Sequence, residues 1–213
     1  MYPISYEADF NPEPNRWTTF FRLILAIPWM IVGYFWILLF YVGVFLAWLL
    51  VTILGRYPQW LYDFNAGVVR FTTRFSAWMY LQTDEWPPFG LSDDPSYPIR
   101  VNIAPPAARQ SRLKAFFRHL LALPVLFVYS YGTALITSVA AVVAWLTIVF
   151  RGYLPQGIND MFTYTHSFQA RVLGYAALLT DDYPPIGLER AKDIPAAAPA
   201  PPSQPQPPAA PAV

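Results

Sequence analysis

Two acidic pairs come closest, in residue type and spacing, to a catalytic set. Asp84 with Glu85, and Asp181 with Asp182, each stand directly before an aromatic residue and a Pro-Pro dipeptide. Paired carboxylates can act as general acid and base when a nucleophile, a second base or a metal ligand stands beside them. Neither pair has such a neighbour in the sequence. We therefore interpret both pairs as solvated charges at helix ends.

Other catalytic chemistry finds little support. The chain of 213 residues has no cysteine, which excludes disulfides and thiolate nucleophiles. Its two histidines, His119 and His166, stand far apart in the sequence, and a metal site needs several convergent ligands. The chain also lacks the G-x-S-x-G, H-E-x-x-H, P-loop and G-x-G-x-x-G patterns. We expect no enzymatic activity, no metal and no cofactor. The net charge of +1 favours no nucleic-acid partner.

Ionisable residues in apolar surroundings are the second chemical feature. Five of them form a candidate intramembrane polar seam: Asp63, Arg70, Arg74, Asp160 and Arg171. Ionisable side chains inside a membrane are costly and often functional. The structural alternative is that the aspartates complement helix dipoles while the arginines reach the headgroups. One functional version pairs Asp63 with Arg171, and Asp160 with Arg74.

The elements that must position these side chains are two long apolar blocks. Residues 23–54 and 120–150 contain no charged residue; the first block lies between Arg22 and Arg56, and the second lies between Arg118 and Arg151. About 20 apolar residues span the hydrocarbon of a bilayer. The chain is 55% hydrophobic and only 13% charged, whereas soluble domains carry about 25% charged residues. We therefore predict an integral membrane protein whose partners include membrane lipids.

The first block is longer than a single crossing requires. Its 32 residues would form a helix of about 48 Å, against a hydrocarbon core of about 30 Å. Three solutions are open: one tilted helix kinked near Pro28 with its first turns in the interface, a hairpin of two short helices, or a re-entrant bend at Gly33 and Gly43. The lack of a polar loop favours the kinked helix. Residues 59–83 predict a second helix, which either crosses the bilayer or lies in the interface.

The second half of the chain repeats the first. The segment around Phe20-Phe21-Arg22 recurs at an offset of 96, and after a one-residue insertion the offset becomes 97. Between residues 55 and 91, 13 of 37 positions are identical to those 97 residues later, where chance would give about two. The matches include charged residues, Pro and Gly in register, so we infer an internal duplication.

Both copies end in the pattern Thr-Asp-x-(Trp/Tyr)-Pro-Pro. With the Phe-Phe-Arg segment and the Gly-x-x-Pro turn after each apolar block, this pattern resembles bacterial integral membrane proteins of the domain-of-unknown-function family 4389. The first copy departs to Trp where the family has Tyr, and Ser167 and Tyr153 replace Arg70 and Arg56 in the second copy. The resemblance implies architecture and membrane location, but no activity. The repeat-end motifs comprise Asp84, Trp86, Pro87, Pro88, Asp181, Tyr183, Pro184 and Pro185.

These patterns predict an all-α integral membrane fold made of two tandem two-helix units, with four transmembrane helices in total. The first repeat covers residues 2–91, a linker 92–96, and the second repeat 97–188. Short extended segments, residues 2–9 and 97–104, precede the helices and are expected to pair as strands. Residues 189–213 are rich in Pro and Ala, which predicts a disordered tail with polyproline II character.

The charge pattern predicts an orientation for this arrangement. If each repeat crosses twice, the N-terminus, the linker and the C-terminus share one side. That side then holds nine Lys and Arg residues, and the opposite side holds only Arg56 and Arg151. The positive side is cytoplasmic. We therefore expect a multi-pass protein of the cell membrane with both termini in the cytoplasm.

The expected function is a non-enzymatic scaffold or accessory subunit that acts through its aromatic helices, its cytoplasmic face and its C-terminal tail. Its protein partner would be another membrane protein or further copies of the chain. The alternative is a small transporter or lipid-handling protein that uses the polar seam between the repeats, because duplicated units are common among transporters.

Overall fold

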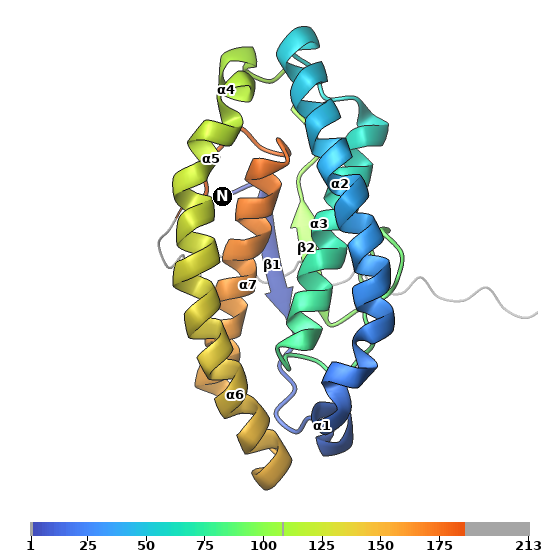
Figure 1. The fold of residues 1–213 in the computed structure, drawn as a ribbon, viewed down its shortest axis with the longest axis vertical. Coiled ribbons are helices and arrows are strands. Elements are labelled where there is room, and N and C mark those ends of the chain that lie inside the picture. The colour runs from blue at the N-terminus through green and yellow to red at the C-terminus, as the bar shows by residue number, and fades with distance from the viewer. Residues whose placement is uncertain (1, 108, 186–213) are drawn as a thin grey trace, which may run out of the picture.

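The computed structural model describes residues 2–107 and 109–185 as a mostly helical fold (Figure 1). The tail at 189–213 lies outside the described residues. The elements, in chain order, are β1 (Ile4–Ala8), α1 (Arg16–Leu25), α2 (Ile27–Leu54), α3 (Gln59–Met79), β2 (Ile99–Ile103), α4 (Arg112–Phe116), α5 (Arg118–Phe127), the π-helical stretch η1 (Val128–Thr133), α6 (Ala134–Arg151) and α7 (Gln156–Ala176).

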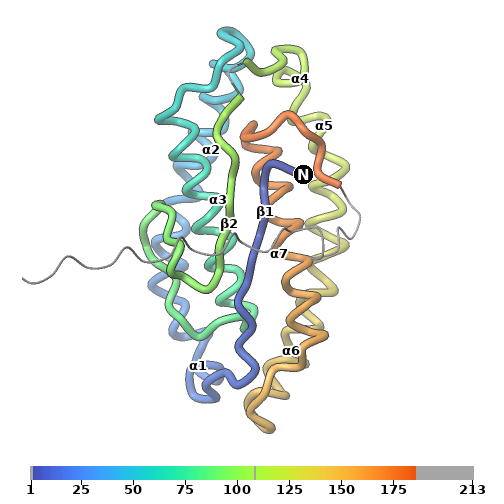
Figure 2. The backbone as a smooth tube through the Cα atoms, turned by 180° about the vertical axis from the view of Figure 1, so that it is seen from behind, coloured from blue at the N-terminus to red at the C-terminus, as the bar shows by residue number. Residues whose placement is uncertain are grey.

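The elements form three layers. Figure 1 shows α2 on the right and the continuous α5–η1–α6 segment on the left, both in front, and Figure 2 shows the two strands on the opposite side. The helices α3 and α7 lie between these layers, where they pack against each other, against the front helices and against the strands. The middle layer is therefore the core, and it holds more buried side chains than either of the other two layers.

The two strands pair as the sequence predicts. β1 and β2 are antiparallel, with Ile4 opposite Ile103 and Ala8 opposite Ile99. Side chains in a strand alternate between its two faces. Ile4 and Tyr6 of β1, like their counterparts in β2, are buried against α3 and α7, and the polar residues between them face outward. The prediction of an all-helical fold therefore holds for most of the chain, with one two-stranded sheet added.

The first apolar block is neither a hairpin nor a re-entrant bend. A break at Ala26 separates α1 from α2, and Pro28 stands in the first turn of α2, where its missing N–H costs no helical hydrogen bond. Gly33 and Gly43 are buried within an uninterrupted helix of 28 residues. They let α3 approach closely: a Cβ at Gly43 would stand 2.5 Å from the Asn65 Oδ1 atom.

The second apolar block contains the one-residue insertion as a π-helical turn. The offset between the repeats is 96 up to Pro124 and 97 from Ala144 onward, and η1 lies between these positions. A π-turn holds one more residue than an α-turn, so it absorbs an insertion without rotating the helix beyond it. As a result, Ala144 and Ile148 are buried like Ala47 and Val51 of α2.

Each repeat packs its N-terminal segment onto the other repeat. β1 lies on α7, β2 lies on α3, α1 packs against α6, and α4 packs against α2. The helices α2 and α6 end at Gly55 and Gly152, whose φ angles of 69° and 82° are left-handed. The guanidinium groups of Arg112 and Arg16, from the opposite repeats, lie directly against these two turns. The two repeats are therefore interlocked.

This interlocking does not match the arrangement behind the predicted orientation. After α3 the chain returns along β2, so α1 and α4 lie at opposite ends of the long axis rather than together (Figure 1). The basic residues of the two repeats are divided between both ends, and the nine-to-two count does not apply. Among the described residues, two helical segments are long and apolar enough to cross a bilayer, Ile27–Leu54 and Arg118–Arg151. Four spans are not confirmed.

Candidate functional site

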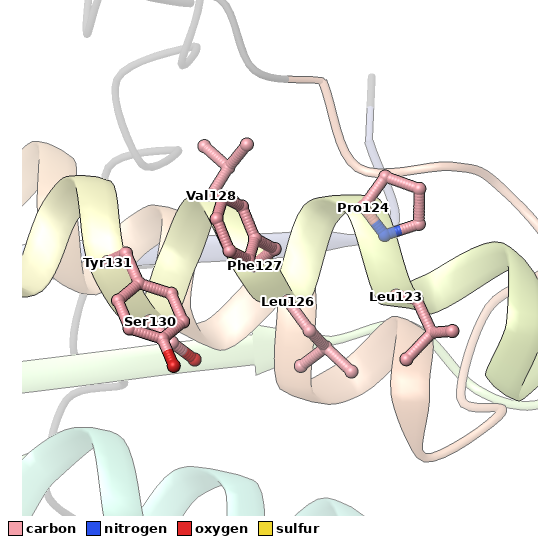
Figure 3. Close-up of a pocket in the computed structure, with 7 residues that line it drawn as sticks. All are labelled: Leu123, Pro124, Leu126, Phe127, Val128, Ser130 and Tyr131. Carbon is pink, nitrogen blue, oxygen red and sulfur yellow. The ribbon is translucent and has the colours of Figure 1, made fainter.

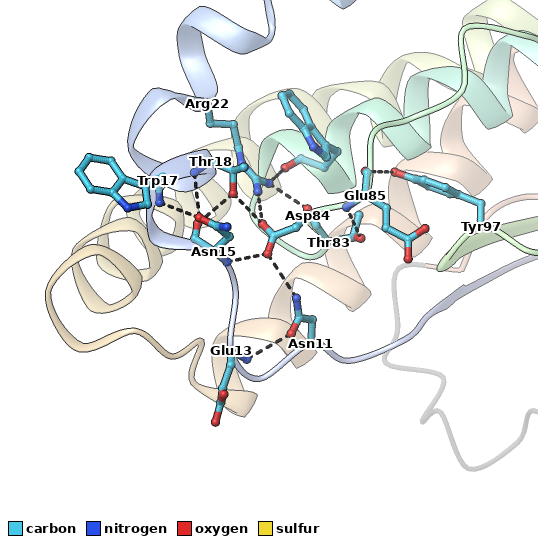
Figure 4. Close-up of polar contacts among 11 residues, drawn as sticks. Asn11, Glu13, Asn15, Trp17, Thr18, Arg22, Thr83, Asp84, Glu85 and Tyr97 are labelled. Atoms are coloured by element: carbon cyan, nitrogen blue, oxygen red, sulfur yellow. Dashed lines mark hydrogen bonds and ion pairs between the residues drawn. The ribbon is translucent and has the colours of Figure 1, made fainter.

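The repeat-end motif of the first copy forms a clamp on the start of α1 (Figure 4). Arg22 is buried, and its guanidinium donates to the Thr83 carbonyl oxygen at 3.0 Å, to Asp84 Oδ1 at 2.7 Å and to the Trp78 carbonyl oxygen. It also lies over the Trp78 ring, 4.8 Å from the centroid. The second carboxylate oxygen of Asp84 accepts from the Asn15 backbone N–H at 2.7 Å.

Asn15 explains why a helix begins there. Its side-chain oxygen accepts from the backbone N–H groups of Trp17 and Thr18, which satisfies two of the donors that a helix start leaves without partners. Asp84 thus fixes both the N-cap residue and the arginine about two turns later. Burial lowers the pKa of Arg22 to about 10, against the raising effect of Asp84, so the guanidinium stays charged at neutral pH.

The second copy forms the same clamp. Arg118 donates to the Thr180 carbonyl oxygen at 2.7 Å and to Asp181, and it lies over the Tyr175 ring. Asp181 accepts from the backbone N–H of Ser111, the N-cap residue of α4. The repeat-end motif therefore holds the start of a helix in each copy, and we call this arrangement of arginine, aspartate and N-cap residue the latch. Asp84 and Asp181 are each engaged by an arginine and by a backbone N–H, so the interpretation of these two aspartates as solvated charges is wrong.

The aromatic and proline residues of the motifs complete each latch. In the first copy, Trp86 stacks on Trp29 and Trp78 at centroid distances of 4.7 and 5.3 Å, and the Pro87 carbonyl accepts from the Trp29 indole N–H. In the second copy, Tyr183 meets the edge of the Tyr175 ring at 5.3 Å. The departure from Tyr to Trp in the first copy thus corresponds to a larger aromatic cluster.

The five residues of the predicted polar seam do not converge on one site. The Arg74 guanidinium is buried and bonds to the carbonyl oxygens of Ile99 and Ser92 and to Asp93. Asp160 is exposed, so the predicted pair of Asp160 with Arg74 is wrong, and Asp93 of the linker takes that place. Nothing in the spacing within one helix could indicate a partner in a linker.

The remaining seam residues have separate surroundings. The Arg70 Nε–H donates to the Val101 carbonyl oxygen, so Arg70 and Arg74 together close the outer edge of β2. Asp63 is exposed and accepts from the Gln59 side chain at 2.8 Å. The Arg171 guanidinium lies 5.6 Å from the centre of the Tyr2 ring, as Arg74 lies over Tyr97 in the other repeat. The two arginines thus hold the N-terminal strand of the opposite repeat.

A buried polar cluster was missed by sequence reasoning. Gln82 accepts from the Tyr6 hydroxyl and faces the His166 Nδ1, both at 2.7 Å, and its amide donates to Asn159 and Thr163. Burial lowers the pKa of His166 to about 3, so the imidazole is neutral at physiological pH. At the offset of 97, Gln82 and His166 correspond to Leu179 and Val69. The sequence signal that could have indicated this cluster is a polar residue in one copy at a position where the other copy has an apolar residue.

Two shallow hollows lie among the described residues, both on the front layer. One has a volume of about 650 Å³ and follows α5 and η1, lined by Leu123, Pro124, Leu126, Phe127, Val128, Ser130 and Tyr131 (Figure 3). The other lies along the first turns of α2. Both are lined almost entirely by apolar side chains. No group of three or more His, Asp or Glu residues within 2–107 and 109–185 could hold a metal ion.

A family model described as a domain of unknown function, DUF4389, matches residues 16–90 and 112–186. The chain belongs to the DUF4389 family. No curated protein and no solved structure matches it. The DUF4389 segments begin with α1 and α4 and end just past each Pro-Pro, so each one contains both halves of a latch, the arginine and the aspartate. The two tandem copies inferred from the sequence are thereby confirmed.

Proposed function

We propose that this DUF4389 protein is a non-enzymatic scaffold or accessory subunit of the cell membrane. In this proposal the front layer, α2 and α5–η1–α6, lies in lipid, and the strand layer presents a polar surface to a protein partner. The observation that carries the proposal is the contrast between the two faces. Large apolar side chains are more than half exposed along α2 and α6, among them Val42 and Val139, whereas the outer face of the sheet is polar and charged.

The polar surface has a defined pattern. Arg100 of β2 pairs with Asp9 at 2.7 Å and with Glu7 at 3.4 Å, and Asn102 is exposed beside them. Because Arg70 and Arg74 occupy the carbonyl groups along the outer edge of β2, an added strand is disfavoured there. A partner would therefore recognise the side chains of the sheet face, where a charge pattern gives specificity more than raw affinity.

Transport is the second candidate function. The two repeats run antiparallel, and inverted repeats are common in secondary transporters, where the substrate site lies between them. In this chain the polar groups between α3 and α7 bond to one another or to the strands, and the two described hollows lie on the apolar layer. These contacts favour the scaffold over a solute pathway.

The test uses a photoactivatable amino acid placed on either face in native membranes. Substitution at Asn102 is expected to give adducts with a discrete protein, and substitution at Val42 or Val139 is expected to give lipid adducts. The matched control is the double variant Asp9→Arg and Arg100→Asp, which keeps the ion pair but reverses the surface pattern, and it should lose the Asn102 adduct. Absence of a protein adduct at the sheet face, or solute uptake by the reconstituted protein, would contradict the scaffold.

A further inference from the structure

The apolar surface of the chain forms one broad face rather than a belt around the molecule. On α2, Ile31, Val42 and Ile53 are 57%, 53% and 59% exposed, and α6 is similarly exposed through residues such as Leu135 and Val139. Figure 1 shows both helices in the same layer, and Figure 2 shows the strands covering the other side of α3 and α7. Lipid contact along this face leaves the opposite face to water.

The charged sheet lies beside the middle of the long apolar helices, not beyond their ends. β2 follows α3 from Arg74, which bonds to the Ile99 carbonyl, to Tyr62, which bonds to the Ala104 carbonyl. α3 in turn packs against α2 between Gly33 and Gly43.

The outward side chains of the sheet therefore stand at the mid-height of α2. If α2 crossed the bilayer, the half-exposed ion pair of Arg100 with Asp9 would lie level with the part of α2 around Gly33, inside the apolar length of the helix and not beyond its end. That placement is costly for charged groups.

The two ends of the molecule carry the same chemistry. One end holds Arg16, Trp17 and Arg151, and the other holds Arg112 and Lys114, each with exposed aromatic residues beside them. A spanning orientation would place one of these basic ends on each side of the membrane, against the usual one-sided distribution of Lys and Arg. The two repeats are related by an approximate two-fold axis, which exchanges the two basic ends of the molecule. The two ends therefore have equivalent surroundings only when both lie at the same depth in the membrane.

We infer that the chain lies flat in one leaflet, with α2 and α5–η1–α6 parallel to the membrane plane and both basic ends among anionic headgroups of the same side. This inference rests on the membrane embedding proposed above, but not on the protein partner. A helix with its side chains is about 10 Å across, which fits within one leaflet of about 15 Å. Interfacial helices bind in this way through buried apolar area and attraction to anionic lipids.

Single-cysteine labelling tests the sidedness, and the chain has no native cysteine to remove. Glu13→Cys marks the α1 end, Lys114→Cys marks the α4 end, and Asn102→Cys marks the sheet; all three positions are exposed. A membrane-impermeant maleimide is applied to right-side-out and inside-out vesicles. We expect all three cysteines to react in the same vesicle orientation. Reaction of Glu13→Cys and Lys114→Cys in opposite orientations would overturn the inference.

Depth measurement supplies an independent test. Ile31, Val42 and Ile53 are spaced by 11 residues, which places them on one face of α2 within about 20° per step. Each is replaced by cysteine, labelled with bimane and quenched by lipids brominated at defined depths. A flat helix gives the same depth at all three positions. A spanning helix places Val42 about 16 Å deeper than Ile31 and Ile53, and that profile would refute the flat orientation.

The two proposals fail in different ways. Loss of the protein adduct at Asn102 with uniform labelling and equal depths would remove the partner but keep the flat orientation. Opposite labelling of the two ends with a persistent adduct would keep the scaffold but remove the flat orientation. Release of the whole protein from the membrane by an alkaline carbonate wash would contradict both.

Discussion

The buried His166 should make the folded state lose stability as the pH falls from 7.5 to 5. Its imidazole is enclosed by the Gln82 amide and the rings of Tyr6, Tyr80 and Phe162, and burial lowers its pKa to about 3. In the unfolded chain a histidine has a pKa of about 6.5. The unfolded state therefore takes up the proton first when the pH falls, and the stability present above pH 6.5 is lost progressively below it.

The magnitude follows from the two pKa values. At pH 5 the unfolded histidine is almost fully protonated while the folded one stays neutral, which costs the folded state about 2 kcal/mol relative to pH 7.5. This figure is insensitive to the folded pKa as long as that pKa lies below about 4. For a chain of this size it corresponds to a fall of about 4–8 °C in the unfolding midpoint.

The assay is thermal unfolding in detergent micelles, followed by tryptophan fluorescence at pH 7.5 and pH 5. The control is His166→Val, because Val69 holds the matching position in the other repeat. His119 and all carboxylates remain in both proteins, so the difference between their pH responses reports His166 alone. Equal falls of the midpoint in the wild type and in His166→Val would show that the imidazole is already protonated or accessible in the folded chain.

Three further predictions concern stability, each measured by unfolding in detergent. Arg22→Met removes the donor from the Thr83 carbonyl oxygen and the cation from the Asp84 carboxylate, and it should cost about 3 kcal/mol; a cost below about 1 kcal/mol would show that the latch carries little stability. Gly152→Ala should cost about 1–2 kcal/mol because its φ is left-handed and a guanidinium lies against it, whereas Gly157→Ala, in open space, should be neutral; equal effects would remove that argument. Deletion of Gly132 should turn η1 into an α-turn and be tolerated, whereas deletion of Leu38 should disrupt α2; equal damage would refute the account of the insertion.

The sequence alone predicted the local features of the fold. Pro28 indicated the kink at the start of α2, the Gly-x-x-Pro turns marked the ends of the apolar blocks, and residues 2–9 and 97–104 were expected to pair as strands. These features depend on the backbone preferences of single residues and on the periodic alternation of apolar and polar residues that are close in sequence. The duplication could also be detected from the sequence, because charged residues, Pro and Gly of one copy align in register with identical residues of the other.

The long-range packing was not predictable from the same signals. No pattern within a segment indicates that Arg74 bonds to Asp93 and to the β2 backbone rather than to a helix, or that Arg22 reaches the Thr83 carbonyl. The charge count behind the predicted orientation does not apply for this reason: a return strand between α3 and α4 changes which basic residues share an end. The buried Gln82 and His166 were noticeable only as departures between the copies, and their contact depends on the tertiary fold.

The exchange of N-terminal segments has a consequence for the origin of the fold. Because β1 and α1 pack on the second repeat, while β2 and α4 pack on the first, one repeat alone leaves its own helix core without a covering strand. A chain of half the length could cover this core only by exchanging N-terminal segments with a second copy, as in a domain-swapped homodimer, and the duplication places both exchanged segments in one polypeptide. Residues 1–96 and 97–185, produced as separate chains, should therefore reassemble when they are expressed together, whereas neither of them should fold as a monomer when it is expressed singly.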